Sequence, residues 1–207
     1  DEKIFGLGDK SGFMDKSGRS FRIEATDAMG YDAEASDPLY KHIPFYICEN
    51  SVGDYGVFYD TSAACYMDFG VEINNYYQPY KFFKTEDNCI VYYVIFGSKL
   101  EILRSFARLC GKQAFPPKWS FDFCASATEY AYAENTDEKM QGFVDSLKKY
   151  DLSCSGLYSS IGDKGCVFNW NTEKFPDPAK FVNSLEEKDI HFIPNIKPAF
   201  LLTHPMY

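Results

Sequence analysis

The first half of the chain alternates short runs of β-branched and aromatic residues with turn-forming Gly, Pro and Asp. Turn sequences such as SVGD and TEDN separate these runs, which is typical of antiparallel strands. We therefore predict a β-sandwich for this half. The predicted strands are FRIEA at 21–25, IPFYIC at 43–48, YGVFYD at 55–60, CYMDFG at 65–70 and CIVYYVIFG at 89–97.

A helical period replaces the strand pattern in SKLEILRSFARLCG at 98–111. Ser98 and Glu101 have the spacing of a capping box, and Gly111 follows the last helical turn as a stop. Apolar residues recur at helical spacing, which favours a helix. These residues are Leu100, Leu103, Phe106, Ala107 and Cys110.

After Pro116 and Pro117 the pattern alternates strand and helix. We predict strands at 120–126, 154–160 and 191–196, joined by two helices. The first helix follows Thr136, and its apolar face consists of Met140, Phe143, Val144 and Leu147. The second helix is capped by Asp177 and starts at Pro178. Its inward residues are Phe181, Val182 and Leu185. Alternation of this kind predicts a parallel sheet covered by helices, either doubly wound or the opening of a barrel.

The two patterns indicate two domains, a β-domain at 1–115 that ends in the helix and an α/β domain at 116–207. Three parallel strands cannot close a barrel, so the second domain is expected to be incomplete. We therefore interpret the sequence as a piece of a longer protein.

Composition narrows the class of partner. A net charge of −9 and a pI near 4.8 disfavour nucleic acid, which is bound mainly through clustered Lys and Arg. No apolar run is long enough to span a membrane, and the N-terminus does not resemble a signal peptide.

Seven cysteines without a C-x-x-C pair favour reduced thiols in the cytoplasm. The three histidines lack metal-ligand spacing, so neither a metal nor a cofactor is expected, and no oligomeric state is predicted.

Several ordered motifs resemble glycoside hydrolase family 31. In the first half these are GLGDKSGFMDKSGR, TDAMGYD, DPLYKHIPFYI, YGVFYDTSA and FPPKW; in the second half they are FCASATEY, FNWNTEKFPDPAKFV, IKPAF and HPMY. The resemblance covers nearly the whole chain. It implies a galactose-mutarotase-like antiparallel β-sandwich followed by the first three β/α units of a (β/α)8 TIM barrel.

The resemblance also implies a retaining α-glycosidase or transglycosylase that acts on α-linked sugars through two carboxyl groups about 5 Å apart. The family's nucleophile motif after the fourth barrel strand does not occur here. Both catalytic carboxylates are thus expected beyond Tyr207, and the chain alone should be inactive. The expected substrate is an α-glucoside or an α-N-acetylgalactosaminide. A noncatalytic carbohydrate-binding protein on the same fold is the alternative.

Family 31 also suggests sugar-contacting positions. Asp27 lies in the β-domain loop that the family extends over the barrel mouth. The loops after the three barrel strands, at 126–130, 158–163 and 197–200, contain the other candidates. Most α-glucosidases of the family carry Asp-x-Asp after the second strand and Asp-Pro after the third. This chain has serines at the first place and a lysine before proline at the second, which places glucose specificity in doubt. The substrate-binding candidates are Asp27, Thr128, Ser160, Asp163 and Lys197.

Overall fold

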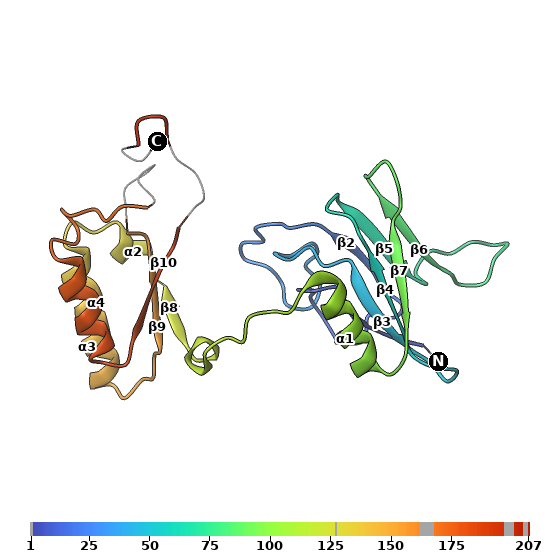
Figure 1. Ribbon diagram of the computed structural model, residues 1–207, viewed down its shortest axis with the longest axis horizontal. Coiled ribbons are helices and arrows are strands. Elements are labelled where there is room, and N and C mark those ends of the chain that lie inside the picture. The colour runs from blue at the N-terminus through green and yellow to red at the C-terminus, as the bar shows by residue number, and fades with distance from the viewer. Residues whose placement is uncertain (1, 127, 162–167, 197–200, 205–206) are drawn as a thin grey trace. The chain divides into compact units, whose positions relative to one another are not determined.

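The computed structural model describes residues 2–126, 128–161, 168–196, 201–204 and 207 (Figure 1). The chain divides into two compact units, Asp1–Gln113 and Ala114–Tyr207. The first unit contains antiparallel sheets and one long helix, and the second contains a parallel sheet with helices. The change from antiparallel to parallel strands confirms the fold class predicted from the two sequence patterns.

Two antiparallel sheets build the first unit. One has the order β1-β3-β4-β7 and consists of β1 (Lys3–Gly6), β3 (Phe45–Glu49), β4 (Tyr55–Tyr59) and β7 (Tyr92–Phe96). The other has the order β2-β5-β6 and consists of β2 (Ser20–Ile23), β5 (Cys65–Phe69) and β6 (Lys81–Thr85). Strands β1 and β6 were not predicted from the sequence.

The sheets pack face to face through aromatic and aliphatic side chains. Tyr59 of one sheet stacks on Phe83 of the other at a centroid distance of 3.6 Å, and Tyr46 meets Phe69 edge to face at 5.1 Å. Such ring pairs stabilise a core beyond the area that they bury. The rest of this core consists of Ile4, Leu7, Phe21, Ile23, Cys48, Val57, Cys65 and Met67.

Helix α1 (Lys99–Cys110) begins with the predicted capping box. The Ser98 backbone N–H and hydroxyl both donate to the Glu101 carboxylate, at 2.9 and 2.6 Å, and these bonds lower the pKa of Glu101. Of the apolar residues that recur at helical spacing, Leu100 and Leu103 are exposed and Phe106 packs on the sheet, together with the fully buried Ile102. Spacing alone could not choose between two apolar stripes one residue apart.

Helix α1 lies against the β1-β3-β4-β7 sheet (Figure 1). Ile102 and Phe106 attach it to the outer side of this sheet. The Phe106 ring stacks on Phe45 with centroids 4.0 Å apart. Strand β3 is therefore covered on both faces, by α1 on one side and by the second sheet on the other. This explains why four successive residues of β3, Phe45 to Cys48, are buried without alternation.

The second unit holds the parallel sheet β10-β9-β8. Its strands are β8 (Cys124–Ser126), β9 (Gly156–Ser159) and β10 (His191–Pro194), and its helices are η1 (Lys118–Phe121), α2 (Thr128–Ala131), α3 (Thr136–Lys149) and α4 (Pro178–Glu186). Both strand pairs are parallel, as predicted. Asp177 caps α4 by accepting from the Lys180 N–H at 3.0 Å, with Pro178 in the first turn, also as predicted.

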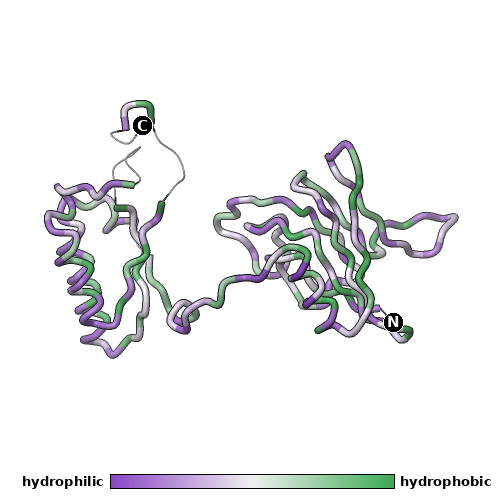
Figure 2. Tube along the Cα trace, viewed as in Figure 1, coloured by the Kyte–Doolittle hydropathy of each residue, from purple (hydrophilic) through white to green (hydrophobic). Residues whose placement is uncertain are grey.

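Helices α3 and α4 cover one face of this sheet. In Figure 2 the hydrophilic residues of these helices lie mostly on the side away from the strands. Their inward side chains form a core with the strand residues that face them, and Trp170 packs against it. The core consists of Ala125, Met140, Val144, Leu157, Phe175, Phe181, Leu185 and Ile190.

Gly156 is required by the close packing of the parallel sheet. A Cβ at this position would lie 2.7 Å from the Cys124 sulfur and 3.0 Å from Ile193. We expect Gly156→Ala to lower the free energy of unfolding by about 1–3 kcal/mol, because the core would be overpacked. Urea unfolding of the full-length protein, followed by hydrogen exchange of peptides that cover β8 and β9, reports on this unit.

Gly142→Ala is the matched control. Gly142 lies within α3, and a Cβ there would meet no atom within 4 Å. Alanine is the better helix former, so this change should stabilise the unit by about 0.5–1 kcal/mol. Equal effects of the two substitutions would contradict the packing described for Gly156.

The three-stranded sheet should not be stable outside a larger protein. A polypeptide of residues 116–207 has parallel edges at β8 and β10 and is expected to be molten or to aggregate. Light scattering and a calorimetric melt test this expectation. A sharp, reversible transition of a monomer would contradict it.

Candidate functional site

An open pocket of about 250 Å³ lies at the C-terminal ends of the parallel strands. This is the edge at which barrel and open α/β folds place their ligand sites. The side chains come from the ends of β8 and β9, from α2 and its following residue, and from the residue just after β10. They are Ser126, Ala131, Tyr132, Tyr158, Ser159, Ser160 and Asn195.

The strand register explains how these residues meet. Ser126 is opposite Tyr158 in neighbouring strands, and Ser159 is opposite Pro194 in the next pair. Leu157 and Ser159 are buried, whereas Tyr158 is 43% exposed. Because side chains alternate along a strand, Tyr158 points to the face opposite Leu157 and the helices.

Backbone pairing continues just past the strand ends and fixes the pocket floor. The Asn195 N–H donates to the Ser159 carbonyl oxygen at 2.8 Å. The Ser159 hydroxyl donates to the Ser160 carbonyl oxygen at 3.3 Å. Ser159 is thus held by hydrogen bonds, whereas Ser160 and Asn195 are exposed at the pocket.

The described lining is polar and uncharged. Three serines, two tyrosines and one asparagine supply hydroxyl, phenol and amide groups, each able to donate and accept hydrogen bonds. Tyrosine rings also offer an apolar face to a sugar ring. Among the described residues, no group of three His, Cys, Asp or Glu side chains is placed to hold a metal ion. This chemistry suits a polyhydroxylated neutral ligand.

Among the candidates predicted from the sequence, Ser160 lies in this pocket. Thr128 is the first residue of α2, but its side chain is outside the described part of the chain. Asp163 and Lys197 also lie outside the described residues. The assignment of these three side chains to a sugar site stays a prediction.

Asp27 belongs to the first unit and lies in an exposed loop between β2 and β3. The Thr26 N–H donates to the Leu39 carbonyl oxygen at 3.0 Å, and the Tyr40 hydroxyl donates to the Ala28 carbonyl oxygen at 3.1 Å. Desolvation and the nearby Asp27 carboxylate raise the pKa of Tyr40. The two sides of the loop are therefore tied together around Asp27, whose role in ligand contact stays a prediction.

A buried ion pair anchors the same loop to β2. The Lys10 ammonium, whose side chain is 0% exposed, lies 2.5 Å from the Asp37 carboxylate. Asp37 also accepts the Arg22 backbone N–H, and Lys10 donates to the Arg22 carbonyl oxygen. The Asp37 carboxylate is thus both the counterion of the buried Lys10 ammonium and the acceptor for a backbone N–H of β2.

Tyr132 and Asn195 were missed by the sequence analysis. The predicted loop after the first strand stopped at residue 130, and the third strand was extended to residue 196. Strand β10 ends at Pro194, so Asn195 is the first residue past the strand. Tyr132 follows α2, a single turn of helix that is too short to give a periodic signal.

Comparison with known proteins identifies the family. Residues 1–68 match the N-terminal galactose mutarotase-like domain of glycosyl hydrolase family 31, and residues 113–207 match the TIM-barrel domain of the same family. The chain belongs to glycoside hydrolase family 31. The parallel sheet of the second unit is therefore the opening of a barrel, and the doubly wound alternative is excluded.

Curated family 31 relatives align along nearly the whole chain. The α-xylosidase XylQ of Lactiplantibacillus pentosus is 29% identical over all of this chain and 26% of its own length. Alpha-glucosidase 2 of Bacillus thermoamyloliquefaciens is 26% identical over 95% of this chain and 24% of its own length. The chain thus spans about a quarter of the length of the curated relatives that it matches.

Solved structures agree with the fold. A family 31 dextranase of Flavobacterium johnsoniae, determined in complex with glucose, is 28% identical with a TM-score of 0.77 over 97% of this chain and 24% of its own. A family 31 α-glucosidase of Bacteroides thetaiotaomicron is 19% identical with a TM-score of 0.71 over 99% of this chain and 35% of its own. The latter supports the fold alone. In the described part of this chain, none of the helices has the length and apolar character needed to cross a bilayer.

Proposed function

We propose that this chain forms the N-terminal β-domain and first barrel units of a retaining α-glycosidase, acting by hydrolysis or by transfer to another acceptor. The observation that carries the proposal is the neutral, hydroxyl-rich pocket at the C-terminal ends of β8, β9 and β10 in a family 31 barrel domain. Barrel enzymes bind their substrates at this end of the strands. The chain would supply part of the pocket wall, with the catalytic carboxylates located beyond Tyr207.

The proposed substrate is an α-linked sugar, either an α-glucoside or an α-N-acetylgalactosaminide. An α-glucosidase, an α-xylosidase and a dextranase among the relatives support the α-linkage. The neutral lining around Ser160 favours a sugar other than unmodified glucose, because the carboxylates that hold glucose hydroxyls in most family α-glucosidases are replaced here by serines.

A noncatalytic carbohydrate-binding protein is the second candidate. The described lining supports it as well, since serine, tyrosine and asparagine side chains can bind a sugar without cleaving it. The two proposals differ in whether the full-length protein contains a nucleophile and an acid/base about 5 Å apart.

The deciding experiment uses the full-length protein with 4-nitrophenyl α-glucoside, α-xyloside and α-N-acetylgalactosaminide. Turnover of at least one substrate, with the α-anomer as the first product in ¹H NMR, is the expected result. The 207-residue chain alone should release no nitrophenol. Sugar binding by calorimetry without turnover of any substrate would favour the binding protein, and the β-anomer as first product would contradict retention.

We also propose a cytoplasmic location. The six cysteines in the described residues are free thiols, and Cys48 and Cys65 are buried in the sandwich core. Free core thiols are typical of a reducing compartment. Recovery of the native protein from the culture medium rather than from cell lysate would contradict this location.

A further inference from the structure

The outer face of the β2-β5-β6 sheet carries a row of residues unlike an ordinary solvated surface. Arg22, Tyr66 and Lys84 are directly opposite one another in the three strands. Their sequence neighbours Phe21, Met67 and Phe83 face the sandwich core. Because side chains alternate along each strand, the row is presented on the face away from the core.

Aromatic rings extend this row along the sheet. The Tyr66 and Phe82 rings lie 5.7 Å apart at an angle of 33°, and Tyr80 lies 6.1 Å from Phe82 at 41°. The Tyr80 hydroxyl donates to the Glu72 carboxylate at 2.8 Å. All three rings are half-buried, so each is held in place while part of it faces solvent.

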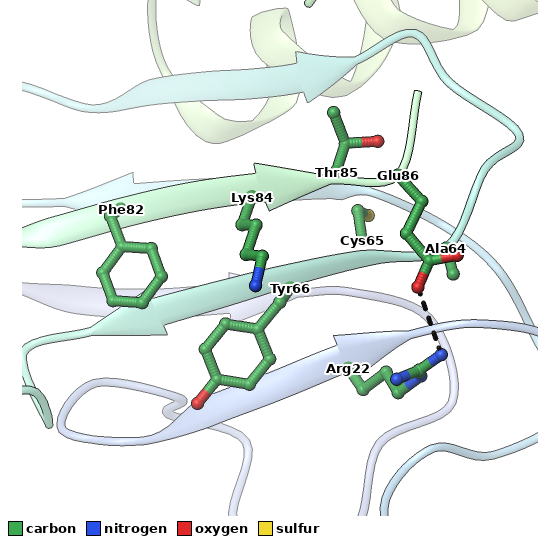
Figure 3. Close-up of a pocket in the computed structure, with 8 residues that line it drawn as sticks. All are labelled: Arg22, Ala64, Cys65, Tyr66, Phe82, Lys84, Thr85 and Glu86. Atoms are coloured by element: carbon green, nitrogen blue, oxygen red, sulfur yellow. Dashed lines mark ion pairs between the residues drawn. The ribbon is translucent and has the colours of Figure 1, made fainter. Parts of the chain in front are cut away.

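A hollow of about 290 Å³ lies against these residues. Figure 3 shows Tyr66, Phe82 and Lys84 on its surface, with Arg22 and Glu86 closing one end through an ion pair. The two ends of that ion pair are 3.5 Å apart, and Arg22 also bonds Glu24 at 2.6 Å. The guanidinium and carboxylates thus lie beside the aromatic rings and remain accessible to solvent.

The charge balance indicates the kind of ligand. Arg22, Lys84 and Glu86 line the hollow, and two more carboxylates lie beside it, Glu24 bonded to Arg22 and Glu72 bonded to Tyr80. Two cations and three carboxylates leave no excess of positive charge. An anion-binding site would show an excess of cations. Donors and acceptors beside aromatic faces suit a neutral molecule with an apolar ring face and many hydroxyl groups, which is a saccharide.

We propose that this hollow is an accessory site for a neutral α-linked oligosaccharide. The inference rests on the proposed function, since the ligand is taken to belong to the same class as the substrate. Tyr66 and Phe82 stack on sugar rings, and Arg22, Lys84 and Glu86 bond their hydroxyls. The site belongs entirely to the first unit and needs no residue of the barrel.

Native electrophoresis of the full-length protein through gels that contain dextran or maltodextrin tests the proposal, and variants of the hollow distinguish it from the barrel pocket. The protein should be retarded in at least one of the two gels. Tyr66→Ala and Phe82→Ala should each raise the dissociation constant by about tenfold, the equivalent of one lost ring contact. Tyr150→Ala, which removes an exposed tyrosine of the second unit, is the matched control and should migrate like the wild type.

Circular dichroism of each variant shows whether the sandwich is intact, and Arg22→Gln gives a third substitution that spares the aromatic rings. Retardation that persists in folded Tyr66→Ala and Phe82→Ala, or a wild-type chain that moves freely in both gels, would overturn the site. Stronger retardation by dextran sulfate than by dextran would overturn the neutral ligand. Nitrophenol release by the full-length protein is measured separately, so a failure of the proposed activity is distinguished from a failure of this site.

Discussion

The full-length protein should hydrolyse simple aryl α-glucosides with a kcat/KM well below about 10⁴ M⁻¹s⁻¹, the lower end of the usual enzyme range. Most α-glucosidases of the family have carboxylates after the second and third barrel strands, where this chain has Ser160 and Lys197. A hydrogen bond from a sugar hydroxyl to a buried carboxylate contributes about 1.5–3 kcal/mol. Loss of two such bonds should therefore cost several powers of ten in glucose recognition.

Variants of the pocket test this explanation directly. Ser160→Asp restores a carboxylate at an exposed pocket position and should raise kcat/KM for the aryl α-glucoside by about tenfold or more. Asp163→Ala and Lys197→Ala should raise KM or lower kcat for the preferred substrate. If the wild type already turns over the aryl α-glucoside efficiently and both alanine variants behave like it, the proposed correspondence of these loops is wrong.

Replacing Asp37 with alanine should destabilise the first unit by about 3–5 kcal/mol, because it leaves the buried Lys10 ammonium without its counterion. The Arg22 N–H would lose its acceptor as well. Urea unfolding by circular dichroism measures the change. Hydrogen exchange of peptides that cover β2 and β5 should show protection lost at the same positions.

Asp9→Ala is the control within the same unit. Asp9 pairs with Lys41 at 3.2 Å, and their side chains are 41% and 62% exposed. An exposed pair of this kind contributes about 0–1 kcal/mol. If Asp37→Ala were as mild as Asp9→Ala, Lys10 would have to reach solvent in the variant, and the loop around Asp27 would not depend on this anchor.

Elements with strong local signals were predicted correctly. The capping box of Ser98 and Glu101, the cap at Asp177 and the inward face of α3 all follow from side-chain chemistry within one or two helical turns. The parallel order of the second unit followed from the alternation of strands and helices. The strand and helix pattern did not distinguish a barrel from a doubly wound sheet. The family 31 motifs indicated that the parallel sheet is the first part of a barrel.

The omissions arose where local sequence carries no information about partners. Ile102 rather than Leu100 faces the sandwich because Phe45 and Ile47 lie beneath it, and those residues are distant in sequence. Ser126, Tyr158 and Asn195 meet only through strand register. The row of Arg22, Tyr66 and Lys84 depends in the same way on pairing between strands, so no single strand predicts it.

Strand β6, KFFKT, has adjacent phenylalanines that point to opposite faces, Phe83 to Tyr59 in the core and Phe82 to the outer hollow. A one-residue insertion within β6 would exchange the two rings with little change in apolar area, so the aromatic pair by itself barely fixes the phase of the strand. The two lysines of the strand contribute to fixing it. In the native phase the Lys81 ammonium donates to Glu2 and to the Tyr55 hydroxyl, whereas the exchanged phase would turn the Lys84 ammonium toward the core. Insertions should therefore be tolerated in the exposed segment 71–79 and excluded from β6. Lys84→Leu should make β6 prone to alternative pairing with its neighbouring strand, even though it leaves the core composition unchanged.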